Sequence, residues 1–182
     1  MVGIRKQIDG QRKGNSMKYL RTLLVLFAAF LVTAAPSRAD DKVIRQQIQA
    51  EYLKADAATR SRDLDRVMNH YTADFKLKVG SKTLDRKKVT SLVHWQIVAT
   101  KEIKALSFSI QSLVVKGNTA VATVKQNETI VVFKNQTQYL LTSEQVSEDT
   151  WVNTTDGWRL KFQDVKHNVT TQDGKTIPQL YE

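Results

Sequence analysis

Cysteine is absent from this chain of 182 residues, and histidine occurs only three times, at His70, His94 and His167. Without cysteine the chain can form no disulfide bond and can carry no lipid anchor on a cysteine. The three histidines show none of the short spacings typical of a metal site. The sequence also has no glycine-rich phosphate loop and no Ser-His-Asp order, which argues against nucleotide binding and against hydrolase chemistry. We therefore expect no metal and no cofactor.

The sequence has no apolar run of the roughly 20 residues that a membrane-spanning helix needs. Its longest such run, residues 23–32 (LLVLFAAFLV), follows basic residues and precedes small ones. This order is typical of a secretory signal peptide. We expect residues 1–39 to be removed between Ala39 and Asp40, with a cut after Ala35 as the alternative, and Met17 to be the true start. The mature protein, residues 40–182, is then one domain, secreted or periplasmic, without a membrane anchor.

The basic charge of the chain is concentrated in the segment that we expect to be removed. Residues 1–39 carry seven of the 28 basic residues and one of the 18 acidic ones, so residues 40–182 carry 21 and 17, a net charge of +4 rather than +10. A nucleic-acid-binding surface needs basic residues gathered on one face. We expect no nucleic-acid partner, and we interpret the basic stretches 60–62 and 86–88 as solvated surface.

Three segments of the mature chain show helical periodicity. Each begins at an aspartate suited to cap a helix, namely Asp40 or Asp41, Asp63 and Asp85. The first helix is expected over residues 41–60 and the second from Asp63 to about Tyr71. The apolar residues recur at helical spacing in three stripes: Ile44, Ile48, Tyr52 and Ala55; Leu64, Val67, Met68 and Tyr71; and Val89, Leu92, Val93, Gln96 and Ile97, the last widened by Trp95.

The rest of the mature chain reads as strands. A short hairpin is expected over residues 75–84, and four long strands follow from Ile103, separated by turns at 117–118, 134–136 and 156–157. Along the strands, the apolar residues change from even-numbered to odd-numbered positions near Ser112 and again after Phe162. Each such slip in parity predicts a bend, and two bends would curl the sheet. Three helices followed by an antiparallel meander indicate an α+β domain with all helices on one face.

The order of four short segments carries a resemblance to a known family. They are Arg-Asp-Leu-Asp at 62–65, Tyr-Thr-Ala-Asp-Phe at 71–75, Asp-Thr-Trp-Val at 149–152 and Asp-Gly-Trp-Arg at 156–159. Together they resemble the NTF2-like superfamily, and within it the SnoaL-like and DUF4440 branch. The resemblance implies a cone of the cystatin-like class, in which three N-terminal helices pack on a strongly curved antiparallel sheet around a pocket. It also implies a homodimer formed through the outer sheet face.

The resemblance leaves the activity open, since the superfamily includes isomerases, dehydratases, cyclases, epoxide hydrolases and non-catalytic binding domains. Isomerase-type members place a general-base aspartate where this chain has Val79, and a tyrosine where it has Ala55. Kinase-association members carry a His-x-His pair where this chain has Phe162 and Asp164. The positions of the isomerase-type acid–base groups thus hold aliphatic side chains.

Candidate pocket residues come from strand parity and from the aromatic content. Gln126 and Glu128 share the parity of the apolar residues of their strand, so both point into the cone if that face is concave. The alternative is that the strand pairing twists at mid-strand and exposes the side chains of both residues. We take eight residues as pocket candidates: Tyr52, Tyr71, Trp95, Gln126, Glu128, Trp151, Phe162 and Asp164. The aromatic members can equally be core, and Asp164 can equally be solvated.

Three functions fit these observations. The first is an exported, non-catalytic domain that binds a small, partly apolar molecule or a partner protein in its cone. The second is an enzyme of lyase, isomerase or cyclase type that uses Glu128 or Asp164 as a relocated acid–base group. The third is a dimeric scaffold whose pocket is filled by its own side chains.

Overall fold

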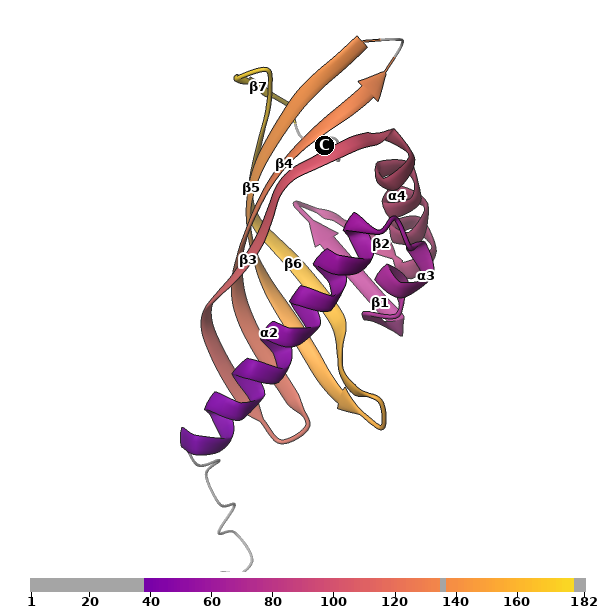
Figure 1. Ribbon diagram of the computed structural model, residues 1–182. Coiled ribbons are helices and arrows are strands. Elements are labelled where there is room, and N and C mark those ends of the chain that lie inside the picture. Colours follow the sequence, from indigo (N-terminus) through magenta and orange to yellow (C-terminus); the bar gives the residue numbers. More distant parts are fainter. Residues whose placement is uncertain (1–37, 135–136, 179–182) are drawn as a thin grey trace, which may run out of the picture. The chain divides into compact units, whose positions relative to one another are not determined.

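The computed structural model describes residues 38–134 and 137–178, which belong to one compact unit (Figure 1). Most of the expected signal peptide, with Met17, lies outside the described residues, as does most of the expected turn at 134–136. The expected cleavage point, between Ala39 and Asp40, lies within the first turn of the first described helix. Within the described ranges, the structure contains no helix that is long and apolar enough to cross a membrane.

Three helices occupy the expected parts of the chain: α2 (Arg38–Arg60), α3 (Leu64–Met68) and α4 (Arg86–Ala99). The side chain of Asp63 accepts a hydrogen bond from the backbone N–H of Arg66 at 3.0 Å, and Asp85 accepts one from Lys88 at 2.9 Å. These are the capping contacts expected from the sequence. The second helix is shorter than expected, because the carbonyl of His70 accepts a bond from Leu160 instead of continuing the helix. Tyr71 therefore begins a strand.

The sheet is mixed rather than wholly antiparallel. Its strands are β1 (Tyr71–Val79), β2 (Lys82–Asp85), β3 (Thr100–Lys116), β4 (Thr119–Lys134), β5 (Thr137–Thr154), β6 (Gly157–Gln172) and β7 (Lys175–Ile177). The order is β2-β1-β6-β5-β4-β3, with β7 beside β6. Strands β1 and β6 run parallel, because α4 carries the chain from the first hairpin to the opposite edge of the sheet and the meander returns beside β1.

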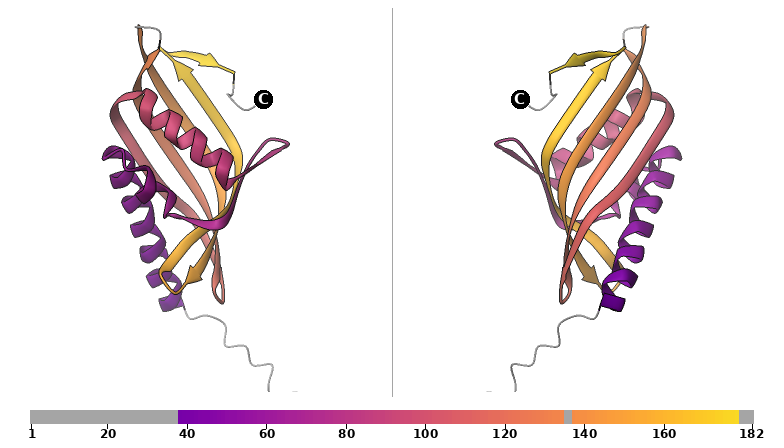
Figure 2. Two further views of the ribbon diagram at one scale, coloured as in Figure 1. Left: turned by 90° about the vertical axis from the view of Figure 1, so that its right-hand side faces the viewer. Right: turned by 90° about the vertical axis from the view of Figure 1, so that its left-hand side faces the viewer.

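Bulges bend the long strands, one of them at the expected place near Ser112, whereas those of β6 lie on either side of the slip expected after Phe162. The register of β3 against β4 shifts between Ile110 and Ser112, as expected. Strand β6 shifts twice against β5, with Lys161 and Lys166 as the extra residues. Each extra residue moves the following side chains to the other face of the sheet. The sheet curls around α2 and α4, which lie on its inner face (Figure 2).

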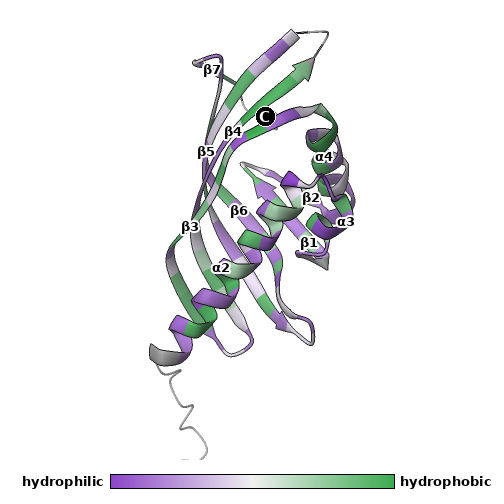
Figure 3. Ribbon diagram, in the orientation of Figure 1, coloured by the Kyte–Doolittle hydropathy of each residue, from purple (hydrophilic) through white to green (hydrophobic). Residues whose placement is uncertain are grey.

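The core lies between the inner sheet face and the helices. Trp151, Phe75 and Ile48 are among its largest fully buried side chains. Four residues of one parity on β4 are buried in this core: Ala120, Ala122, Val124 and Ile130. Hydrophobic segments recur on the strands and helices that enclose it (Figure 3). This arrangement, an α+β domain with its helices on one face of a curved sheet, confirms the expected fold class.

The free edge of β3 is covered by side chains from α2 and from the loop after it. Arg45 donates a hydrogen bond to the carbonyl of Ile110 at 2.9 Å, and Arg62 donates to the carbonyls of Thr100 and Lys101, both at 2.9 Å. An uncovered edge strand invites pairing with another chain. The interpretation of residues 60–62 as plain solvated surface was therefore incomplete, because Arg62 shields this edge.

Candidate functional site

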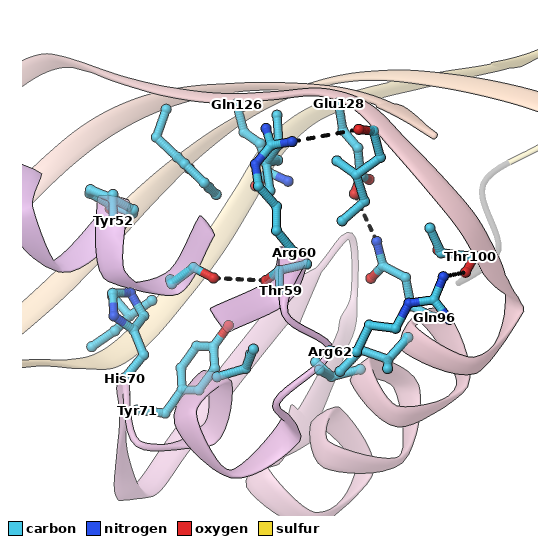
Figure 4. A pocket seen from close by; sticks show the side chains of 18 of the residues that line it. Tyr52, Thr59, Arg60, Arg62, His70, Tyr71, Gln96, Thr100, Gln126 and Glu128 are labelled. Atoms are coloured by element: carbon cyan, nitrogen blue, oxygen red, sulfur yellow. Dashed lines mark hydrogen bonds between the residues drawn. The ribbon is translucent and has the colours of Figure 1, made fainter. Parts of the chain in front are cut away.

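A cavity of about 310 Å³ lies between α2, α4 and the inner sheet face (Figure 4). Its lining is about half apolar or aromatic, with Tyr52, Val93, Ile97, Leu106 and Phe108 among these residues, and about half polar or charged. Tyr52 stacks on Phe108 with ring centroids 5.1 Å apart. A cavity of this size is typical of small-molecule sites.

A second cavity, of about 440 Å³, lies between α4 and the inner face of β4 to β6. Leu92 and Trp95 come from the helix, and Ile130, Val132 and Leu141 from the strands. The two cavities share a wall, which is made by three polar side chains: Gln96, Gln126 and Glu128.

Glu128 is the acidic residue of this shared wall. Its carboxylate accepts a hydrogen bond from Nε2 of Gln96 at 2.9 Å (Figure 4). Burial disfavours the charged form and raises the pKa of Glu128, and the bond from Gln96 offsets only part of this effect. A carboxyl group with a raised pKa that faces a cavity is a candidate for direct contact with a ligand.

A second unusual carboxylate, Asp149, is fully buried beneath the first cavity, with 0% of its surface exposed. It accepts hydrogen bonds from the hydroxyl of Tyr52 and from Oγ of Ser147, the latter at 2.7 Å. Burial raises the pKa of Asp149 to about 6, although these donors favour the charged form. Asp149 therefore ties α2 to β5 from inside the core.

His70 and Tyr71 close the inner end of the first cavity. The His70 ring packs edge-on against Trp151 and Tyr71, with centroids 5.0 and 5.5 Å away. Its Nδ1 has no hydrogen-bond partner within the described residues. Burial lowers the pKa of His70 to about 3 and raises that of Tyr71 to about 12, so both side chains are neutral at pH 7.

Five of the eight candidate residues line these cavities. Tyr52 and Tyr71 line the first, Trp95 lines the second, and Gln126 and Glu128 line both. Trp95 is nevertheless 55% exposed, so it does not widen the inward stripe of its helix as expected.

The other three candidates are not among the described residues that line either cavity. Trp151 is a fully buried core residue. Phe162 pairs with Thr150 on the outer sheet face, because the bulge at Lys161 reverses the parity of β6. Asp164 follows on that face, and ion pairs with Lys166 at 2.9 Å and Lys78 at 3.2 Å lower its pKa. Its placement makes it a half-buried ion-pair partner on the outer face rather than a cavity group.

The site also contains residues that sequence reasoning missed. Asp149 shares the parity of Trp151, and this alternation could have identified it as an inward carboxylate. No comparable signal in the sequence identifies His70. The helix before it ends because of a contact with a distant strand, and this contact cannot be read from the local pattern. The positions that match the isomerase-type acid–base pair hold Val79, which is core, and Ala55, which lines the first cavity. Over the described ranges, no three His, Asp or Glu side chains gather as a metal site would require.

No protein-family model and no curated protein matches the sequence. Solved structures do match. A protein from Streptomyces avermitilis, provisionally assigned as a dehydratase of the NTF2-like family, is 16% identical with a TM-score of 0.53, and the match covers 69% of this chain and 96% of that one. A provisionally assigned aromatic ring hydroxylase from Novosphingobium aromaticivorans is 16% identical with a TM-score of 0.58, covering 74% and 96%.

A third structure, a provisionally assigned scytalone dehydratase from the same Novosphingobium species, is 12% identical with a TM-score of 0.57, covering 73% of this chain and 90% of that one. Similarity at these identities shows a shared fold and leaves the activity open. The protein has the NTF2-like fold.

Proposed function

We propose that this protein is an exported domain of the SnoaL-like and DUF4440 branch that binds a small, partly apolar molecule in its first cavity without transforming it. The observation that supports the proposal best is the polar wall of Gln96, Gln126 and Glu128, which shares its enclosure with a set of apolar and aromatic side chains. Polar groups on a cavity wall are costly unless they meet water, each other or a ligand. Such groups fix the orientation of a bound molecule.

The contacts around the buried acid favour binding over catalysis. The hydroxyl of Tyr52 is engaged by Asp149, and Asp149 is enclosed in the core, so neither is positioned to exchange a proton with a molecule in the cavity. Glu128 is partnered by the amide of Gln96, which holds it in place but does not relay protons. A general acid or base must reach the reacting atom directly or through one water.

One observation favours the alternative, an enzyme of lyase, isomerase or cyclase type. Glu128 faces the cavity, and its raised pKa brings it closer to the working range of a general acid or base. If the protein is an enzyme, incubation with its co-purified molecule should yield a product, and Glu128→Gln should abolish the conversion while retaining binding.

Native mass spectrometry of the purified protein tests the binding proposal. We expect a species heavier than the polypeptide that releases a small molecule on activation. Ala55→Phe places an aromatic ring in the first cavity and should remove this species. Ala57→Phe is the matched control, because Ala57 lies on the same helix but is exposed, so the species should persist. A protein that carries no small molecule before or after incubation with cell extract would contradict the proposal and favour the self-filled scaffold.

A further inference from the structure

The two cavities meet at one side-chain pair. Gln96 of α4 and Glu128 of β4 are joined by a single hydrogen bond across the shared wall, and both line both cavities. A ligand hydroxyl that donates to Glu128, or a ligand carbonyl that accepts from Gln96, can replace the bond between them. A molecule longer than the first cavity can therefore extend past this pair into the second.

The two cavities differ in the charge of their linings. Three basic residues, Arg60, Arg62 and Lys101, line the first cavity, and all three are exposed, so they form its outer rim. One exposed acid, Glu102, lies beside them. Among the described residues that line the second cavity, none is basic, and Glu128 of the shared wall is its only acid.

The two guanidinium groups of the rim are held in place by other contacts. Nε of Arg60 donates to Asp56 at 2.8 Å, and Nη2 of Arg62 donates to two backbone carbonyls. Each guanidinium has five N–H donors, so each retains donors for a further acceptor. Arginines fixed in this way are suited to bind a carboxylate.

We propose that the ligand is an elongated monocarboxylate that occupies both cavities. Its carboxylate contacts the rim of Arg60, Arg62 and Lys101, its middle passes Gln96 and Glu128, and its apolar arm lies against Leu141 and Ile130. This inference rests on the proposed binding function, which requires only the first cavity.

Isothermal titration calorimetry with three probes tests the length and the charge of the ligand. Dodecanoate should bind at least about tenfold more tightly than hexanoate, because the longer chain buries additional methylene groups. It should also bind more tightly than dodecyltrimethylammonium, which has the same chain and the opposite charge. Equal affinity for the two carboxylates, preference for the cation, or no binding of any probe would overturn the inference.

Variants in the second cavity test whether the apolar arm of the probe binds there. Ala99→Phe fills part of the second cavity and should weaken dodecanoate by about tenfold while hexanoate is unaffected. Leu141→Phe, from the opposite wall, is a second such variant in case the first fails to fold. If both variants fold and bind dodecanoate normally, the arm does not enter this cavity.

The rim is tested with a matched pair of charge reversals on β3. Lys101→Glu should weaken dodecanoate by about tenfold at low salt, whereas Lys104→Glu, which is exposed and outside the cavity lining, should change the affinity less than about twofold. Equal effects would overturn the carboxylate placement. These failures are distinguishable from failure of the proposed function, because native mass spectrometry would still detect a small molecule bound in the first cavity.

Discussion

Replacing Glu128 with glutamine should stabilise the protein in the absence of ligand. The carboxylate is half-buried on the inner face of β4, where burial raises its pKa. Glutamine has nearly the same shape, carries no charge, and can accept the same hydrogen bond from Gln96 through its carbonyl oxygen. The substitution therefore removes the cost of burying a charge and keeps the contact.

The size of this effect follows from the link between pKa and stability. Each unit by which folding raises the pKa of a carboxyl group costs about 1.4 kcal/mol of folding stability at pH values above the folded pKa. We expect a gain of about 1 kcal/mol for Glu128→Gln at pH 7, since the bond from Gln96 offsets part of the desolvation. For a domain of this size, such a gain raises Tm by roughly 3 °C.

The gain should depend on pH in a defined direction. Glu128 has a folded pKa above its unfolded value of 4.5, so its charge destabilises the folded protein at pH 7. Below pH 4.5 the group is protonated in both states and the cost disappears. The difference between variant and parent should therefore shrink as the pH falls from 7 to 4. This difference isolates Glu128, whereas the parent profile also contains His70, whose lowered pKa destabilises the folded protein increasingly as the pH falls below 6.5.

Urea unfolding of parent and variant at pH 7 and pH 4 measures the effect. Glu144→Gln is the control, because Glu144 lies on the outer face of β5 and its ion pair with Lys125, at 2.8 Å, lowers its pKa. That variant should gain no stability at pH 7. If Glu128→Gln changes nothing at either pH, the carboxylate is fully solvated, and the polar wall loses its role in the proposed site.

Three further predictions follow from the buried network, the sequence pattern and the sheet. Burial raises the pKa of Asp149 from 3.8 to about 6, so its charge costs the parent stability as the pH rises. The unfolding free energy of Asp149→Asn minus that of the parent, measured in urea, should therefore increase by up to about 3 kcal/mol from pH 4 to pH 7; a pH-independent difference would refute it. Sequencing of the exported protein should find Asp40 at its N-terminus, and retention of residues 1–39 would refute the cleavage prediction. Light scattering should find a homodimer that Val121→Glu, on the exposed outer face, dissociates; a strict monomer at high micromolar concentration would refute sheet pairing.

Local patterns in the sequence were sufficient to predict most of the secondary structure. Asp63 and Asp85 marked helix starts because a short acidic side chain satisfies free backbone N–H groups without help from distant residues. Parity along β4, which is also a local property, put Gln126 and Glu128 on the face of the apolar residues, and the tertiary structure decided that this face is the inner one. The slip near Ser112 likewise marked a real bulge.

Contacts between distant segments decided the rest. The parallel pairing of β1 with β6 ends α3 early and turns Tyr71 into a strand residue, and a second bulge, at Lys161, moves Phe162 and Asp164 to the outer face. Neither event leaves a mark in the local pattern, because each depends on which strand becomes the neighbour. The same holds for the site, where Tyr52 and Asp149 are 97 residues apart and Gln96 and Glu128 are 32 apart. By itself the sequence determined most of the elements and the parity of uninterrupted strand segments, whereas only the tertiary structure decided where bulges reverse that parity and which inward side chains meet, since a hydrogen bond between two elements requires both to be packed in place.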